Sequence, residues 1–143
     1  MRRGSGLHSG MLALALLAFQ AGQAVPLDPA KGIVSKDPEA RLAAVRALAE
    51  GVQPAAEKLL LGVLDDEDWE VASIAAAELG ELGAKKAVKP LLALALEGPV
   101  RGLRRAAAGA LAAIDPQAAH DKLVKELDGD HALRAGEALV SLG

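Results

Sequence analysis

The only tryptophan of the chain lies in an acidic stretch, residues 65–70 (Asp-Asp-Glu-Asp-Trp-Glu). Clustered carboxylates can bind Ca²⁺ or a basic partner, and an exposed tryptophan often anchors a protein interface. The Asp-x-Asp-x-Asp-Gly spacing of a calcium loop is missing, and acids that precede a helix also satisfy its free N–H groups. We therefore expect Asp68 to cap a helix with Glu70 in its first turn. The candidate contacts for a protein partner are Asp65, Asp66, Glu67 and Trp69.

Two basic clusters could receive an acidic partner. They are Arg101, Arg104 and Arg105, and the lysines Lys85, Lys86 and Lys89. The alternative interpretation is solvated helix surface with salt bridges between neighbouring repeats, and we favour it for both clusters while keeping the three arginines as candidate partner contacts. The formal net charge is −3, which argues against general nucleic-acid binding because a basic footprint is expected there.

The residues that carry most enzyme chemistry are scarce. Cysteine and tyrosine are absent, and the histidines are His8, His120 and His131. His120 and His131 stand next to aspartates, but the close His-x3-His spacing of zinc sites is missing. No serine lies in a Gly-x-Ser-x-Gly turn, and no phosphate loop or dinucleotide fingerprint occurs. We therefore expect no catalytic residues, no metal site, no cofactor and no enzymatic activity.

The first 24 residues have the three parts of a secretory signal peptide. Arg2 and Arg3 precede an apolar run at residues 11–19, and small residues at 21–24 predict cleavage after Ala24. The run is too short to cross a bilayer as a helix, which takes about 20 residues. We expect an exported protein, periplasmic or extracellular, that does not insert in a membrane after cleavage. The alternatives are an uncleaved anchor or a wrongly assigned start, and residues 25–36 predict an extended leader.

An internal repeat organises residues 37–143. The composition is 52% hydrophobic but 1% aromatic, as in close-packed helices rich in alanine and leucine. Four alanine-rich segments each carry a leucine near their end, and the segments between the four also end on leucines. The first set is Leu48, Leu79, Leu111 and Leu139, at spacings of 31, 32 and 28 residues; the second is Leu64, Leu96 and Leu127, at spacings of 32 and 31. The shared period of about 31 residues predicts stacked helix pairs.

Each segment has the apolar periodicity and the end signals of a helix. Asp37-Pro38 and Asp115-Pro116 predict helix starts, and glycines follow several segments at the expected ends. Pro90 is tolerated only in a first turn, so its helix should begin near Ala87 or start irregularly. We expect three antiparallel pairs followed by a single helix, an all-α fold in one domain over residues 37–143.

The repeat resembles the HEAT family, and more closely the short bacterial HEAT-like repeats first noted in phycobilisome lyases. The likeness covers residues 37–143. It rests on Asp37, Arg41, Ala44 and Leu48, on Asp68, Val71, Ala75 and Leu79-Gly80, and on Val100, Arg104, Ala107 and Leu111. The resemblance implies an α-solenoid, a right-handed superhelix of about three and a half repeats. Ala72 and Ala132 stand where the family has arginine and Val100 replaces the acid, so a continuous Asp–Arg ladder is not expected.

Such repeats serve as scaffolds, adaptors and occasionally lyase-like enzymes, and the resemblance implies a partner that is another protein. We expect an exported, non-catalytic protein-binding scaffold. The alternatives are a lyase-like enzyme and a structural segment that self-associates weakly through its C-terminal end. The last alternative rests on the apolar residues that the final helix retains, Leu133, Leu139, Val140 and Leu142.

Overall fold

A computed structural model of the protein describes residues 28–51 and 55–142. These residues form eight α-helices and one short 3-10 helix: α2 (Pro29–Gly32), α3 (Pro38–Glu50), α4 (Ala56–Val63), α5 (Trp69–Glu81), η1 (Lys85–Ala87), α6 (Val88–Glu97), α7 (Arg101–Ile114), α8 (Pro116–Lys125) and α9 (Ala132–Ser141). The predicted signal peptide and its cleavage site lie outside the described residues. The expectation of an all-α fold is confirmed.

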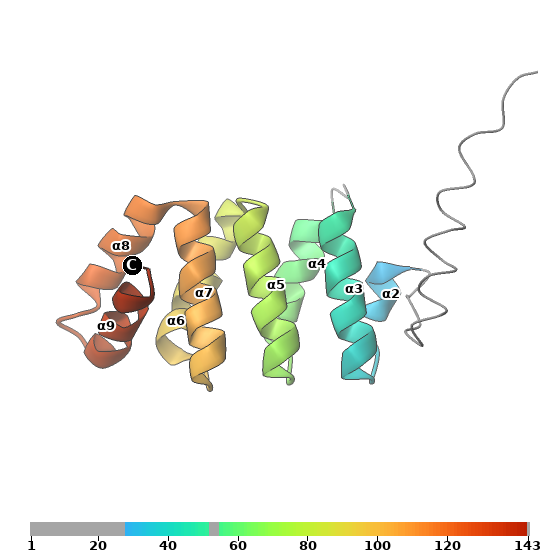
Figure 1. Ribbon diagram of the computed structural model, residues 1–143, viewed down its shortest axis with the longest axis horizontal. Helices are drawn as coiled ribbons and strands as arrows, with labels where there is room; N and C mark the ends of the chain where they lie inside the picture. Colours follow the sequence, from blue (N-terminus) through green and yellow to red (C-terminus); the bar gives the residue numbers. More distant parts are fainter. Residues whose placement is uncertain (1–27, 52–54, 143) are drawn as a thin grey trace, which may run out of the picture.

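The helices stack in pairs along one direction (Figure 1). Helices α3, α5 and α7 lie side by side in one layer, and α4 and α6 lie behind them. Helix α2 contacts α3 at one end, while α8 and α9 lie beyond α7 at the other end. We call α3, α5, α7 and α9 the A helices. Within the described residues, no helix is long and apolar enough to cross a membrane.

The predicted helix starts are confirmed. The side chains of Asp37, Asp68 and Asp115 accept hydrogen bonds from backbone N–H groups in the first turns of α3, α5 and α8, and prolines follow the first and third of them. A cap of this kind contributes about 1 kcal/mol. The irregular start near Pro90 is also confirmed: η1 precedes α6, and Pro90 is the third residue of α6. In that first turn its missing N–H breaks no helical hydrogen bond.

Six leucines form the centre of the stack, each under 2% exposed. Three lie on A helices and three on the helices that follow them: Leu48, Leu79 and Leu111, and Leu60, Leu91 and Leu123. The first three are landmarks of the predicted repeat. Leu64 and Leu96 are also buried, but Leu127 is 39% exposed because α8 ends at Lys125, two residues before it. The expectation that Leu127 closes a helix is therefore wrong.

The A helices begin at residues 38, 69, 101 and 132, so their spacings are 31, 32 and 31 residues. The eleventh residue is Leu48, Leu79 and Leu111 in the first three, and counting from Ala132 gives Leu142 in place of the expected Leu139. The fourth residue is Arg41, Ala72, Arg104 and Ala135, so Ala135 and not Ala132 occupies the arginine position. Helix α9 thus keeps the period of the other A helices, and the expected landmark Leu139, at a spacing of 28, is the departure from it.

The expected extended leader is wrong for residues 29–32, which form the one-turn helix α2. The cause is the pair Asp28-Pro29, the same device that starts α3 and α8. Asp28 accepts a hydrogen bond from the backbone N–H of Ala30. Ile33 packs against the core directly after this turn.

Helices α5 and α7 approach each other more closely than most helix pairs allow. A Cβ added to Gly80 of α5 would lie 2.8 Å from the Cα of Ala110 on α7. Only glycine fits there, since real Cβ contacts are longer. This close approach fixes α7 against the centre of the stack and thereby positions the side chains of its first turn.

Candidate functional site

The acidic stretch before α5 does not form one surface, because Asp66 is buried against Arg41. Arg41 Nε donates to Asp66 Oδ2 and Arg41 Nη2 donates to Asp66 Oδ1, each at 2.8 Å. The two side chains are only 7% and 8% exposed. The prediction that Asp66 contacts a partner is therefore wrong. Its carboxylate neutralises the guanidinium of Arg41, which would otherwise lie in the protein interior without a counter-charge.

Arg41 joins two segments that are far apart in the sequence. Its Nη1 donates to the backbone oxygens of Ser35 (2.9 Å) and Lys36 (3.3 Å), on the segment that leads into α3. The hydrogen bond to Asp66, on the loop between α4 and α5, raises the pKa of Arg41 above its ordinary value, against the opposing effect of burial. Sequence reasoning missed this pair because 25 residues separate its members. The one available signal was the match of Arg41 to the repeat pattern.

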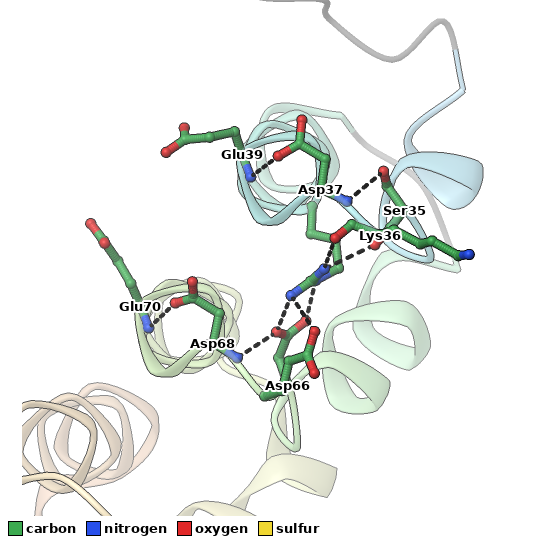
Figure 2. A network of polar contacts seen from close by, with 9 residues as sticks. Ser35, Lys36, Asp37, Glu39, Asp66, Asp68 and Glu70 are labelled. Atoms are coloured by element: carbon green, nitrogen blue, oxygen red, sulfur yellow. Dashed lines mark hydrogen bonds and ion pairs between the residues drawn. The ribbon is translucent and has the colours of Figure 1, made fainter.

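The other acids of the stretch either cap α5 or are exposed to solvent. Asp68 caps α5 as expected, and its own N–H donates to Asp66 Oδ1 at 2.9 Å (Figure 2). Asp65 and Glu70 are exposed, and the side chain of Glu67 is 86% exposed even though it lies 3.6 Å from Arg41 Nη2. Asp65 and Glu67 thus stay accessible to a partner, and Asp66 does not.

Trp69 is half-exposed and lies against the first turn of α7. A Cβ added to Gly102 would come within 3.0 Å of Trp69 Cζ3, so glycine at this position leaves room for the indole ring. The residue is 49% exposed. Part of the ring is therefore held against α7 while the remainder is available to solvent, the arrangement expected of an aromatic anchor in an interface.

The structure brings the three candidate arginines together at the start of α7. Arg101 and Arg105 are exposed, whereas the side chain of Arg104 is only 16% exposed. All three line a pocket of about 230 Å³ between α7 and α9. Arg134 and Glu137 of α9 line the same pocket, and sequence reasoning missed both as members of a site. They lie 30 and 33 residues after Arg104, and no local signal in the sequence shows that α9 packs against the start of α7.

The other polar groups singled out in the sequence lie apart. Lys85, Lys86 and Lys89 are exposed on η1 and α6. His120 lies 3.6 Å from the adjacent Asp121, and His131 lies 3.5 Å from Glu97. In the part of the chain that the structure describes, no three His, Cys, Asp or Glu side chains gather closely enough to hold a metal ion.

Comparison with known families gave one result. The family model for HEAT repeats matches residues 30–112 and, in an overlapping match, residues 57–143. The matches together span all the A helices and all the helices paired with them. The comparison with curated proteins found no match.

Proposed function

Because the chain belongs to the HEAT-repeat family, we propose that it is a non-catalytic scaffold or adaptor that binds another protein. HEAT repeats typically serve as interaction scaffolds, because each stacked helix pair adds exposed surface that a partner can contact. Within the family we propose the closest kinship with the short bacterial HEAT-like repeats. The further proposal that the protein is exported is supported by the signal pattern of residues 1–24.

The observation that carries the proposal is the half-exposed indole of Trp69. In a chain with one tryptophan, one phenylalanine and no tyrosine, this ring is the largest aromatic surface available to a partner. It is held on one side against Gly102, so little conformational freedom is lost when a partner covers the other side. Exposed carboxylates of Asp65 and Glu67 precede it, and the arginine pocket lies beyond it along α7.

Capture of partners from envelope extracts by immobilised protein tests the proposal. We expect wild type to retain a defined partner, and Trp69→Ala to reduce its capture about tenfold or more, as truncation of an aromatic hot spot does. Leu127→Ala is the matched control, since Leu127 is another exposed apolar side chain, at 39% exposure. If the immobilised protein captures nothing beyond what a resin without it retains, the scaffold proposal is contradicted. If wild type and Trp69→Ala capture the partner equally, Trp69 does not contribute to binding. A covalent adduct formed with a bilin and an acceptor protein would contradict a non-catalytic role.

Export has its own test. N-terminal sequencing of the mature protein from its native host is expected to begin at Val25, and fractionation is expected to recover it outside the cytoplasm. Recovery of an intact Met1 terminus in the cytoplasmic fraction would overturn this part of the proposal without affecting the scaffold.

A second candidate function, weak self-association through α9, is favoured by its exposed apolar residues. Leu133 is 81% exposed and Val140 is 84% exposed, and their seven-residue separation puts them on one helix face. We expect light scattering to show concentration-dependent dimers that Leu133→Ser and Val140→Ser weaken. Val34→Ser is the control, because Val34 is 79% exposed at the other end of the described chain. A strict monomer at high concentration would contradict self-association.

A further inference from the structure

Two arginines of this chain occupy the same place in different repeats. Arg41 is the fourth residue of α3, and Arg104 is the fourth residue of α7. Each donates from Nη1 to the backbone oxygen six residues before it, Arg41 to Ser35 at 2.9 Å and Arg104 to Gly98 at 3.1 Å. The two guanidinium groups are therefore anchored in the same way.

Their other donors differ. Arg41 Nε and Nη2 both bind the carboxylate of Asp66, which lies three residues before α5. Arg104 Nε is buried and has no hydrogen-bond partner among the described residues, and its Nη2 reaches Glu137 only at 3.4 Å. The residue three positions before α9 is Gly129, which carries no carboxylate. Arg104 thus lacks the group that completes the same arrangement around Arg41, and a buried donor of this kind is costly to leave unpaired.

The pocket beside Arg104 is strongly cationic. Arg101, Arg105 and Arg134 line it together with Arg104, and Glu137 is the one carboxylate among its lining residues. Arg134 is fixed by donation to the backbone oxygen of Leu96 at 2.9 Å, a contact that leaves its charge unneutralised. Neither α7 nor α9 has a side-chain cap or an acidic residue in its first turn, in contrast to α3 and α5. The first turn of α7, whose Arg101 and Arg104 line the pocket, therefore adds an uncompensated positive helix end to the potential there.

We propose that the pocket between α7 and α9 binds a carboxylate from an acidic segment of the partner protein, received by Arg104 as Asp66 is received by Arg41. The incoming carboxylate takes the place of Glu137 at Nη2, and the planar edge of the guanidinium then turns Nε, which is buried before binding, toward the second carboxylate oxygen. The exposed Arg101 and Arg105 contact neighbouring acids of the segment. Val140, at 84% exposure, offers an apolar contact that favours a peptide over an inorganic anion. This inference rests on the proposed function in that the partner is a protein.

Fluorescence anisotropy with the full chain tests it directly. The probe is a fluorescein-labelled peptide of glutamates around a central leucine, with the glutamine version as its control. We expect the glutamate peptide to bind and the glutamine peptide not to bind. The double variant Arg101→Gln with Arg105→Gln should weaken binding about tenfold, since each exposed ionic contact accounts for about threefold. Lys85→Gln with Lys86→Gln removes the same charge from exposed positions outside the pocket and should change the affinity less than about twofold.

The variant Glu137→Gln supplies a result that misfolding cannot imitate. It removes the carboxylate that competes for Arg104, so the glutamate peptide should bind about threefold more tightly. Weaker or unchanged binding by this variant, or equal losses in the arginine and lysine double variants, would overturn the proposal. Displacement of the peptide by millimolar phosphate beyond the effect of chloride at equal ionic strength would also overturn it, since the pocket would then be a phosphate site. These readouts do not involve Trp69, so their failure leaves the Trp69-dependent capture of a partner standing.

Discussion

Replacing Asp66 by alanine leaves the Arg41 guanidinium buried without its counter-charge. Removal of one member of a buried ion pair costs about 3–5 kcal/mol. Here the lower end applies, because Arg41 keeps hydrogen bonds to the backbone oxygens of Ser35 and Lys36 and has Glu67 at 3.6 Å. We expect Asp66→Ala to lower the free energy of unfolding by about 3 kcal/mol, which lowers the melting temperature by roughly 10 °C in a chain of this size.

Urea unfolding followed by helical circular dichroism, with Trp69 fluorescence as the second probe, measures this loss. Asp65→Ala is the matched control: it removes the adjacent, exposed carboxylate and should change stability by about 0.5 kcal/mol or less. The double variant Arg41→Met with Asp66→Leu should recover most of the loss, since replacing both members of a buried pair by apolar groups is often neutral. A cost for Asp66→Ala below about 1 kcal/mol would refute the reasoning, because Asp66 would then be no more than another surface acid.

The pH dependence of this pair follows from the direction of the pKa shift. The pKa of Arg41 is raised in the folded chain by its hydrogen bond to Asp66, so the associated stability is fully present below the pKa of the unfolded chain, which lies far above neutral pH. It is lost only as the pH rises through the still higher folded pKa. The cost of Asp66→Ala should therefore be the same at pH 7 and pH 9, and a difference above about 1 kcal/mol between the two would contradict this assignment.

Two further perturbations follow from the packing of α5. Gly80→Ala should destabilise the fold by about 1–3 kcal/mol, because its Cβ would meet the backbone of Ala110 at 2.8 Å. The control Gly109→Ala has open space around its Cβ and should stabilise the fold by up to about 1 kcal/mol. Equal effects of the two variants in urea unfolding would contradict the close approach of α5 and α7. Burial raises the pKa of Glu78 above its ordinary 4.5, with Glu81 and Glu50 adding repulsion. The ionised form of Glu78 is thus disfavoured in the folded state, so Glu78→Gln should stabilise the fold by about 0.5 kcal/mol at pH values above the folded pKa. The gain should disappear as the pH falls below 4.5, because Glu78 is then protonated in both the folded and the unfolded chain. A gain in stability that is unchanged at pH 3 would contradict this assignment.

The helices could be predicted from the sequence because their signals are local. The aspartate caps, the prolines that follow them and the leucine period each act within one or two turns, and the start of α6 around Pro90 followed from the chemistry of one residue. The same kind of signal, Asp28-Pro29, starts α2, but the surrounding residues are rich in turn formers and favour the prediction of an extended leader. The register expected for α9 is wrong because it rests on Leu139, 28 residues after Leu111, whereas Leu142, 31 residues after Leu111, keeps the period of the other A helices.

The candidate site could be predicted only in part, because it depends on which distant side chains meet. Trp69 and the arginines of α7 were identified by residue type, and they do lie on neighbouring helices. Asp66 looked equivalent to Asp65 and Glu67 because all three are acids in one loop. Only the packing of α3 against α5 shows that Asp66 faces a buried arginine. Arg134 and Glu137 belong to the site because α9 packs against α7, a contact between helices that local sequence signals do not encode.

Arginine and alanine alternate at the fourth position of the A helices, and this decides which repeats can be copied to lengthen the protein by design. An arginine in place of Ala72 would need a carboxylate at Gly98, three residues before α7, as Arg41 has in Asp66. A Cβ at Gly98 would lie 2.5 Å from the backbone oxygen of Leu94, so no acidic side chain fits. Residues 38–68 carry both Arg41 and Asp66, so copying that repeat keeps each buried arginine matched. Copying the repeat of Arg104, in which Gly129 occupies the place of Asp66, would bury an unmatched charge.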